Sequence, residues 1–277
     1  MRTFDQSTQI QLLNQPTKPQ HQHQGTASHF QAHAAESWGI GGNVNGGWLL
    51  ATAARAALTQ MAHHDPLVAT GYYYLPVTPG PVSISTKNLN QTRSVSTAMA
   101  EVSQNGANNC LFILGATDFA HTRGLNYEKR RPPHVKPREQ CVPAPRENAA
   151  GLAENVTMLF NPEDAWWHTT EPLKNHSYEC WLGHADGAAV QLLDLLMFVD
   201  AVLPAVFSML GPVGWVPTIE LSAQIRRPPQ GSWLKAKVSC MSLSNGLAEE
   251  DVELWDESDQ LVALSRQLFK VRSPTVT

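Results

Sequence analysis

The 277-residue sequence lacks several patterns that would place it in a well-known class. Its four cysteines are far apart and form no C-x-x-C pair, which excludes the usual zinc and dithiol motifs. No basic segment followed by an apolar run opens the chain, so we expect no signal peptide and reduced thiols in a cytoplasmic protein. Lys and Arg total 20 against 24 acidic residues, so no basic excess points to nucleic acid.

Common catalytic motifs are missing as well. The sequence has neither the G-x-S-x-G of serine hydrolases nor the H-E-x-x-H of zinc proteases. Gly41 and Gly46 have the spacing of a P-loop, but Gly47 stands where a lysine is required. His21 and His23, in a Gln- and Pro-rich tract, have no further ligand at metal-binding spacing. None of these patterns indicates a metal or redox cofactor.

What the sequence does contain is a long apolar stretch from Ala188 to Leu210, which predicts one buried helix. Asp200 interrupts it, and its helical neighbours three and four residues away are apolar. A carboxylate in such surroundings needs hydrogen bonds from other segments or has a shifted pKa, which makes it a candidate for chemistry. The stretch contains too many charges, and Pro204, to span a membrane.

A second helix of small apolar residues is predicted near residues 47–63, after a glycine-rich turn. The backbone N–H groups of Gly46, Gly47 and Trp48 would then stand at a helix N-terminus and could face a ligand oxygen. The alternative is a turn that needs glycine only for its backbone geometry. Gly187, followed by Ala188, occupies the corresponding place before the Asp200 helix.

The two predicted helices divide the chain into halves of the same element order: strand, glycine turn, buried helix and antiparallel meander. This order predicts an α+β protein with one unit at residues 1–120 and another at 165–277. Residues 121–164 are rich in Pro and basic residues, and we interpret them as a linker. The basic side chains of this linker could either meet ligand phosphates or be solvated.

Two further polar residues fall where apolar neighbours are expected. Alternation in the last strand places Gln267 on a face with Leu261, Ala263 and Phe269, and Thr218 stands at the entry of an earlier strand. Each of these residues, like Asp200, could be an ordinary hydrogen-bonded core group. Together, a carboxylate, a hydroxyl and an amide could hold one water molecule.

Several segments resemble those of TesB-like acyl-CoA thioesterases, which have a double hotdog fold. The resemblance covers nearly the whole chain, and its segments are NVNGGWLLATAARAAL, TGYYYLPVTPGPVSI, STAMAEVSQNG, LLMFVDAVLPAVF, GWVPTIELSAQIR and EEDVELWDESDQLVALSRQLFKV. It implies two long helices, each wrapped by an antiparallel sheet, and a homodimer or higher homo-oligomer. By position, the family's water-orienting Asp, Thr and Gln fall on Asp200, Thr218 and Gln267.

The activity implied by this resemblance is hydrolysis of an acyl-CoA or of a related acyl-carrier thioester, as in fatty acid metabolism. Asp200 would act as general base or orienting acceptor, and Thr218 and Gln267 would fix the water. Backbone N–H groups at Gly46–Trp48 or at Gly187–Ala188 would stabilise the oxyanion. Two alternatives keep the fold: an acyl-thioester hydratase or dehydratase, in which an Asp and a His usually cooperate, and a non-catalytic binder of acyl or polyketide-like molecules.

Overall fold

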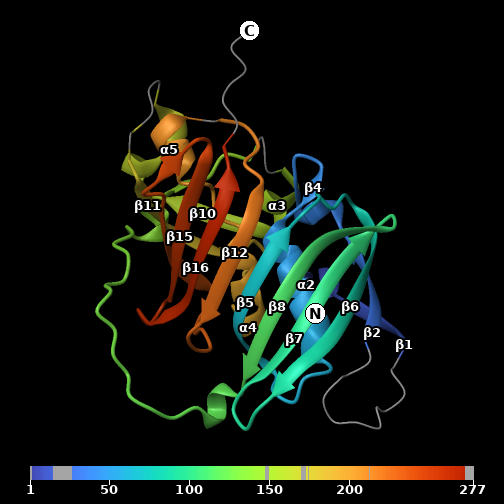
Figure 1. The fold of residues 1–277 in the computed structure, drawn as a ribbon. Helices are drawn as coiled ribbons and strands as arrows, with labels where there is room; N and C mark the ends of the chain where they lie inside the picture. The colour runs from blue at the N-terminus through green and yellow to red at the C-terminus, as the bar shows by residue number, and fades with distance from the viewer. Residues whose placement is uncertain are drawn as a thin grey trace.

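The computed structural model describes residues 2–14, 27–146, 150–169, 173, 175–211 and 213–271. Within these residues a 14-stranded antiparallel sheet runs through both halves of the chain, and helices α2 and α4 pack against each other on its inner side (Figure 1). The Gln- and Pro-rich tract with His21 and His23 lies outside the described residues.

The first half follows the predicted order of strand, turn, helix and meander. Its helices and strands are α1 (Thr3–Ser7), β1 (Ile10–Asn14), β2 (Ser28–Ala34), β3 (Gly39–Ile40), β4 (Asn43–Val44), α2 (Gly46–Leu58), β5 (Asp65–Tyr73), β6 (Gly80–Gln91), β7 (Ser96–Gln104) and β8 (Ala107–Thr117), with short 3-10 helices at Glu36–Trp38 and Phe119–His121. Ten of the 13 residues of helix α2 are buried, and five of these are alanines, so the helix lies in the core beneath the sheet. Its predicted position is confirmed, although it ends at Leu58, before the expected residue 63.

The second half repeats this order. Its elements are β9 (Val142–Pro143), α3 (Ala150–Asn155), β10 (Val156–Phe160), β11 (Ser177–His184), α4 (Leu192–Phe198), α5 (Val206–Leu210), β12 (Thr218–Ile225), β13 (Trp233–Ser239), β14 (Leu243–Ser244), β15 (Leu247–Asp256) and β16 (Leu261–Lys270), with 3-10 helices at Arg138–Gln140, Pro162–Asp164 and Trp166–His168. The sheet order in the first half is β2-β6-β7-β8-β5, and the second half mirrors it as β12-β16-β15-β13-β11. Strands β5 and β12 pair at the centre and join the two halves into one sheet.

The linker prediction requires a correction at its C-terminal end. Residues 122–137 contain no helix or strand and run along the outside of the molecule (Figure 1). Residues 142–164, however, contain β9, α3 and β10, and β10 pairs with β11 along five residue pairs. Alternating burial in Val156–Phe160 places these residues in the second half, where the surrounding Pro-rich sequence hid their strand pattern.

The prediction of one helix over residues 188–210 is wrong. Residues 188–191 are not helical, and α4 begins only at Leu192, where Gln191 and Asp194 form a capping box. Helix α4 ends at Phe198, and α5 begins at Val206. The break follows from Pro204, which has no N–H to donate to the carbonyl of Asp200 and disfavours a helical Leu203. Among the described residues, no helix is long and apolar enough to cross a membrane.

Candidate active site

Asp200 lies in the turn that follows α4, where the helix breaks. Its own N–H donates to the carbonyl of Met197 at 3.1 Å, which closes a tight turn. Its carbonyl, which cannot receive an N–H from Pro204, instead accepts a hydrogen bond from Asn45 Nδ2 at 3.1 Å. A side chain from the first half thus replaces a helical hydrogen bond of the second half and fixes the position of Asp200.

The carboxylate of Asp200 is held at the N-terminus of α2. Its Oδ2 accepts hydrogen bonds from Gly47 N–H at 2.7 Å and from Asn45 Nδ2 at 2.9 Å. Burial raises the pKa of Asp200 to about 6, and the hydrogen bonds from Gly47, Asn45 and Gly46 hold it from rising further. At neutral pH the group is therefore mostly ionised, and it can accept a proton more readily than an exposed carboxylate.

The two glycines at the start of α2 make this approach possible. A Cβ on Gly47 would lie 2.5 Å from the carbonyl oxygen of Met197 and 2.9 Å from Cβ of Asp200. A Cβ on Gly46 would lie 3.0 Å from Asp200 Oδ2 and 2.9 Å from the ring of Tyr73. Glycine is therefore needed here for close contact between the halves, which is more specific than the turn geometry considered from the sequence.

The backbone N–H groups proposed as oxyanion donors are engaged within the protein. Those of Gly46 and Gly47 face Asp200, and that of Trp48 donates to Asn45 Oδ1, the N-cap of α2, at 2.9 Å. The helix N-terminus thus stabilises a carboxylate of the protein itself. The placement of Gly187 at a helix N-terminus is wrong, because its N–H donates to the carbonyl of His184 and α4 begins five residues later.

Thr218 and Gln267 are joined by a hydrogen bond in which Thr218 Oγ1 donates to Gln267 Oε1 at 2.9 Å. Strict alternation would place Thr218 on the face opposite to Leu221. A register shift between Thr218 and Glu220 in the pairing of β12 with β16 brings it to the inner side, beside Gln267. Gln267 itself is buried, as the alternation predicted.

Behind Gln267 lies a carboxylate that the sequence analysis missed. Glu250 is fully buried on β15, and its Oε1 accepts a hydrogen bond from Gln267 Nε2 at 2.8 Å. Burial raises the pKa of Glu250 to about 8. A signal was present in the sequence, since Ala248, Glu250 and Val252 share the inward phase of β15.

Asp200, Thr218 and Gln267 all line one cavity of about 550 Å³ between the two halves. Most of the remaining lining is apolar and comes from both halves, including Leu49, Val156, Met158, Phe207, Trp215 and Phe269. Tyr73 also lines it and donates from its hydroxyl to the carbonyl of Gly46 at 3.1 Å. The cavity therefore joins an apolar space to the three polar groups selected from the sequence.

Of the two alternatives for the linker cations, contact with ligand phosphates finds no support in the contacts of Lys136 and Arg138. Lys136 pairs with Glu163 at 2.6 Å, and Arg138 pairs with Glu257 at 3.3 Å while its guanidinium lies over two tryptophan rings. Neither residue lines the cavity, whereas Arg146, which is exposed, does so. Arg146 is the only Lys or Arg among the described residues of the lining.

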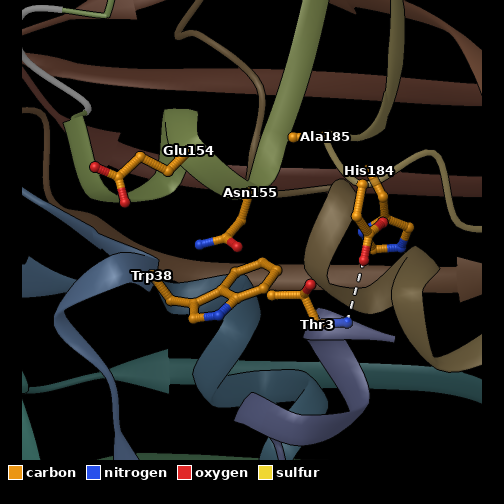
Figure 2. A pocket seen from close by; sticks show the side chains of 7 residues that line it. Thr3, Trp38, Glu154, Asn155, His184 and Ala185 are labelled. Carbon is orange, nitrogen blue, oxygen red and sulfur yellow. Dashed lines mark hydrogen bonds between the residues drawn. The ribbon is translucent and has the colours of Figure 1, made fainter. Parts of the chain in front are cut away.

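A second, smaller pocket of about 260 Å³ lies near α1 (Figure 2). The figure shows Trp38, Asn155 and His184 around it, and the N–H of Thr3 donates to Asp186 Oδ2 at 3.1 Å. His184 is bound to Asp194, which also pairs with Arg2 from the N-terminal segment. These contacts tie the N-terminal segment to α4, and the pocket contains none of the three predicted catalytic residues.

Comparisons with known proteins agree with this architecture. The model of the acyl-CoA thioesterase N-terminal domain matches residues 34–118, and that of the acyl-CoA thioesterase C-terminal domain matches residues 137–271. An uncharacterised protein of Mycobacterium tuberculosis is 25% identical over 268 residues, covering 87% of this chain and 90% of its own.

Solved structures show the same fold over the whole chain. A candidate thioesterase II from Thermobifida fusca YX superposes with a TM-score of 0.87 at 25% identity, covering 99% of this chain and 98% of that one. An acyl-CoA thioesterase II from Mycobacterium marinum gives 0.72 at 14% identity, covering 99% and 100%. The expected double hotdog fold is confirmed, and the chain belongs to the acyl-CoA thioesterase family, with a TesB-like arrangement of two hotdog units.

Proposed function

We propose that this protein hydrolyses an acyl-CoA or a related acyl thioester with a water molecule activated by Asp200. The observation that carries the proposal is the single apolar cavity lined by Asp200, Thr218 and Gln267. An acyl chain would occupy the apolar part of this cavity, which places its thioester carbonyl beside the three polar groups. Binding energy from the chain would then serve to orient the reacting carbon.

In the proposed reaction, Asp200 takes a proton from water while the water oxygen attacks the thioester carbonyl carbon. The C–S bond breaks, the thiolate leaves and takes up that proton, and the products are a carboxylic acid and a free thiol. Gln267 Oε1 and Thr218 Oγ1 supply oxygen atoms that can fix the water's second proton. Gly46 and Gly47 have the role of keeping the Asp200 carboxylate ionised in a buried place.

The hydratase and dehydratase alternative is disfavoured by the composition of the cavity. No histidine occurs among the described residues that line it, so Asp200 has no imidazole partner there. The binder alternative differs from ours only in turnover. It predicts that acyl-CoA occupies the cavity without being hydrolysed.

The test is release of free thiol from a panel of acyl-CoA substrates of increasing chain length, followed with a chromogenic thiol reagent. We expect turnover with wild-type protein and at least about a hundredfold less with Asp200→Asn. Tight binding without thiol release across the whole panel would favour the binder. Parallel assays with acyl-pantetheine would show whether the nucleotide part of CoA is recognised, and Arg146→Ala should raise KM for CoA substrates alone if its cation meets a phosphate.

We also propose that the protein forms a homodimer or higher homo-oligomer. Apolar side chains with 37% to 48% exposure lie on the outer face of the central strands, namely Val68, Tyr72, Ile113, Ile219 and Leu268. A set of this kind on a sheet face is typical of association surfaces. Light scattering at micromolar concentration tests this, and a stable monomer mass would contradict it.

A further inference from the structure

Glu250 is a buried carboxylate that has no part in the reaction described above, although it contacts Gln267. Its Oε1 accepts a hydrogen bond from Gln267 Nε2 at 2.8 Å, and its Oε2 accepts one from the N–H of Ala205 at 2.6 Å. The side chain is fully enclosed, and no ion pair among the described residues includes it. A buried carboxylate without a cation is costly, so its two hydrogen bonds matter for its placement.

These contacts give the side chain of Gln267 a direction. A glutamine amide has a donor end and an acceptor end, and Glu250 takes the donor end. The acceptor end, Oε1, therefore points toward Thr218, whose hydroxyl donates to it and which lines the cavity. The chain of hydrogen bonds runs from Thr218 through Gln267 to Glu250.

The other partner of Glu250 belongs to the segment that continues from Asp200. Ala205 follows Leu203 and Pro204, which both line the cavity, and the hydroxyl of Tyr178 donates to the carbonyl of Leu203. Glu250 thus connects the strand that carries Gln267 with the turn that carries Asp200. Of the three groups proposed to hold the water, Gln267 is therefore bound directly by this carboxylate, and Asp200 is linked to it through the segment that ends at Ala205.

We propose that Glu250 is a positioning residue whose ionised form keeps Gln267 Oε1 turned toward Thr218 and the cavity, and whose protonated form reverses this amide. The inference rests on the hydrolytic function proposed above. A protonated Glu250 carries an O–H that needs an acceptor, and Gln267 can supply one only by turning Oε1 toward it. Its NH₂ group would then face Thr218.

This reversal matters because an attacking water needs acceptors for its protons and a lone pair free to reach the carbonyl carbon. With Oε1 toward the cavity, Gln267 and Asp200 are both acceptors. With the NH₂ group there, Gln267 would donate to the lone pair of the water and compete with the attack. Ionised Glu250 therefore favours the productive arrangement.

The surroundings of Glu250 set the pH range of the effect. The titratable groups that face it are Asp200, Glu249 on its own strand, Tyr178 on β11 and Cys240 after β13. Burial raises the pKa of Glu250 to about 8, with a further upward contribution from Asp200 and Glu249. Turnover should accordingly rise as the pH increases through about 6, where Asp200 ionises, and again through about 8.

The experiment compares Glu250→Gln with Glu249→Gln across this pH range. The glutamine introduced at position 250 keeps the shape of the side chain, but the N–H of Ala205 would take its oxygen and turn its NH₂ toward Gln267, which reverses the Gln267 amide at every pH. We expect kcat at pH 9 to fall by about tenfold or more with KM changed less than about twofold, and the alkaline step to disappear. Glu249→Gln is the matched control: Glu249 Oε1 accepts from the N–H of Met241, so this variant should keep the alkaline step, moved to lower pH because a like charge is lost.

A second measurement does not depend on turnover. The side-chain amide signals of Gln267 in a ¹H–¹⁵N spectrum, assigned by their loss in Gln267→Ala, should titrate between pH 7 and pH 9 in the wild type and not in Glu250→Gln. Absence of that titration, or a Glu250→Gln enzyme with wild-type kcat and pH profile, would overturn the inference. If the wild type hydrolyses no thioester, the proposed function fails, while the spectrum still decides the behaviour of Gln267.

Discussion

Replacing Asp200 by Asn separates the catalytic role of this residue from a structural one. The introduced asparagine retains an oxygen that can accept the hydrogen bonds from Gly47 N–H and Asn45 Nδ2, which now end on Asp200 Oδ2 at 2.7 and 2.9 Å. The shape of the turn is therefore kept, and only the charge and the basicity are lost. The change tests the carboxylate with little disturbance of the packing.

The expected loss of activity is at least a hundredfold in kcat, the lower end for removal of a general base, and it corresponds to about 2.7 kcal/mol of transition-state stabilisation. KM should change little, because the carboxylate acts on water and contacts no part of the acyl chain in the proposed reaction.

Asp200→Asn should lower activity but raise the stability of the folded protein at alkaline pH. The pKa of Asp200 is raised from 3.8 to about 6 in the folded protein, so ionisation destabilises the fold by up to about 3 kcal/mol at pH 8. This destabilisation is absent below about pH 3, where the carboxyl is protonated in both the folded and the unfolded state. The amide of the Asp200→Asn variant is neutral at every pH. The variant should therefore melt at a higher temperature than the wild type at pH 8 and at the same temperature near pH 3, with a difference of about 2 to 4 °C per kcal/mol.

Asp194→Asn provides the matched control, on the helix α4 that precedes the turn of Asp200. Asp194 is fully buried and pairs with Arg2 and His184, so losing its charge should lower the melting temperature while the folded protein keeps its turnover. Thiol release and thermal melts on both variants decide the matter. A folded Asp200→Asn protein with turnover within about threefold of wild type would refute the mechanism, given that loss of a general base costs far more.

Four further variants test the surroundings of Asp200. Asn45→Ala removes the N-cap of α2 and both side-chain hydrogen bonds to Asp200, so the free energy of unfolding should fall by about 2 kcal/mol. The acidic limb of the pH–kcat/KM profile should move to higher pH, because a hydrogen bond that favours the ionised carboxylate is lost. An acidic limb at the wild-type pH would contradict this. Gly47→Ala should lower the melting temperature despite the better helix propensity of Ala, since its Cβ would lie 2.5 Å from the carbonyl oxygen of Met197, and an equal or higher melting temperature would show that α2 and α4 can separate without cost. Thr218→Ala and Gln267→Ala should each reduce kcat, and each effect should shrink in the Asp200→Asn background if all three residues hold one water, whereas additive losses would argue for separate roles.

Local sequence patterns were sufficient for the shared order of strand, turn, helix and meander in the two halves and for placing Asp200 and Gln267 in the interior. Burial in the meanders follows period-two alternation, which is why Gln267 was identified as an amide on an inward face. Asp200 stood out because a charge interrupts an apolar stretch. The same patterns extended that stretch into a single helix, because hydrophobic periodicity does not register the loss of one N–H at Pro204.

The contacts that complete the site join residues far apart in the chain, and only the tertiary structure decided them. Asn45 and Asp200 are 155 positions apart, and the carbonyl left unpaired by Pro204 finds its donor there. Thr218 reaches the inner face through an irregularity in the pairing with β16, which depends on the partner strand. The sequence by itself thus determined which residue types enter the interior; packing of the two halves determined which of them meet, because hydrogen-bond partners are selected by three-dimensional proximity and not by local periodicity.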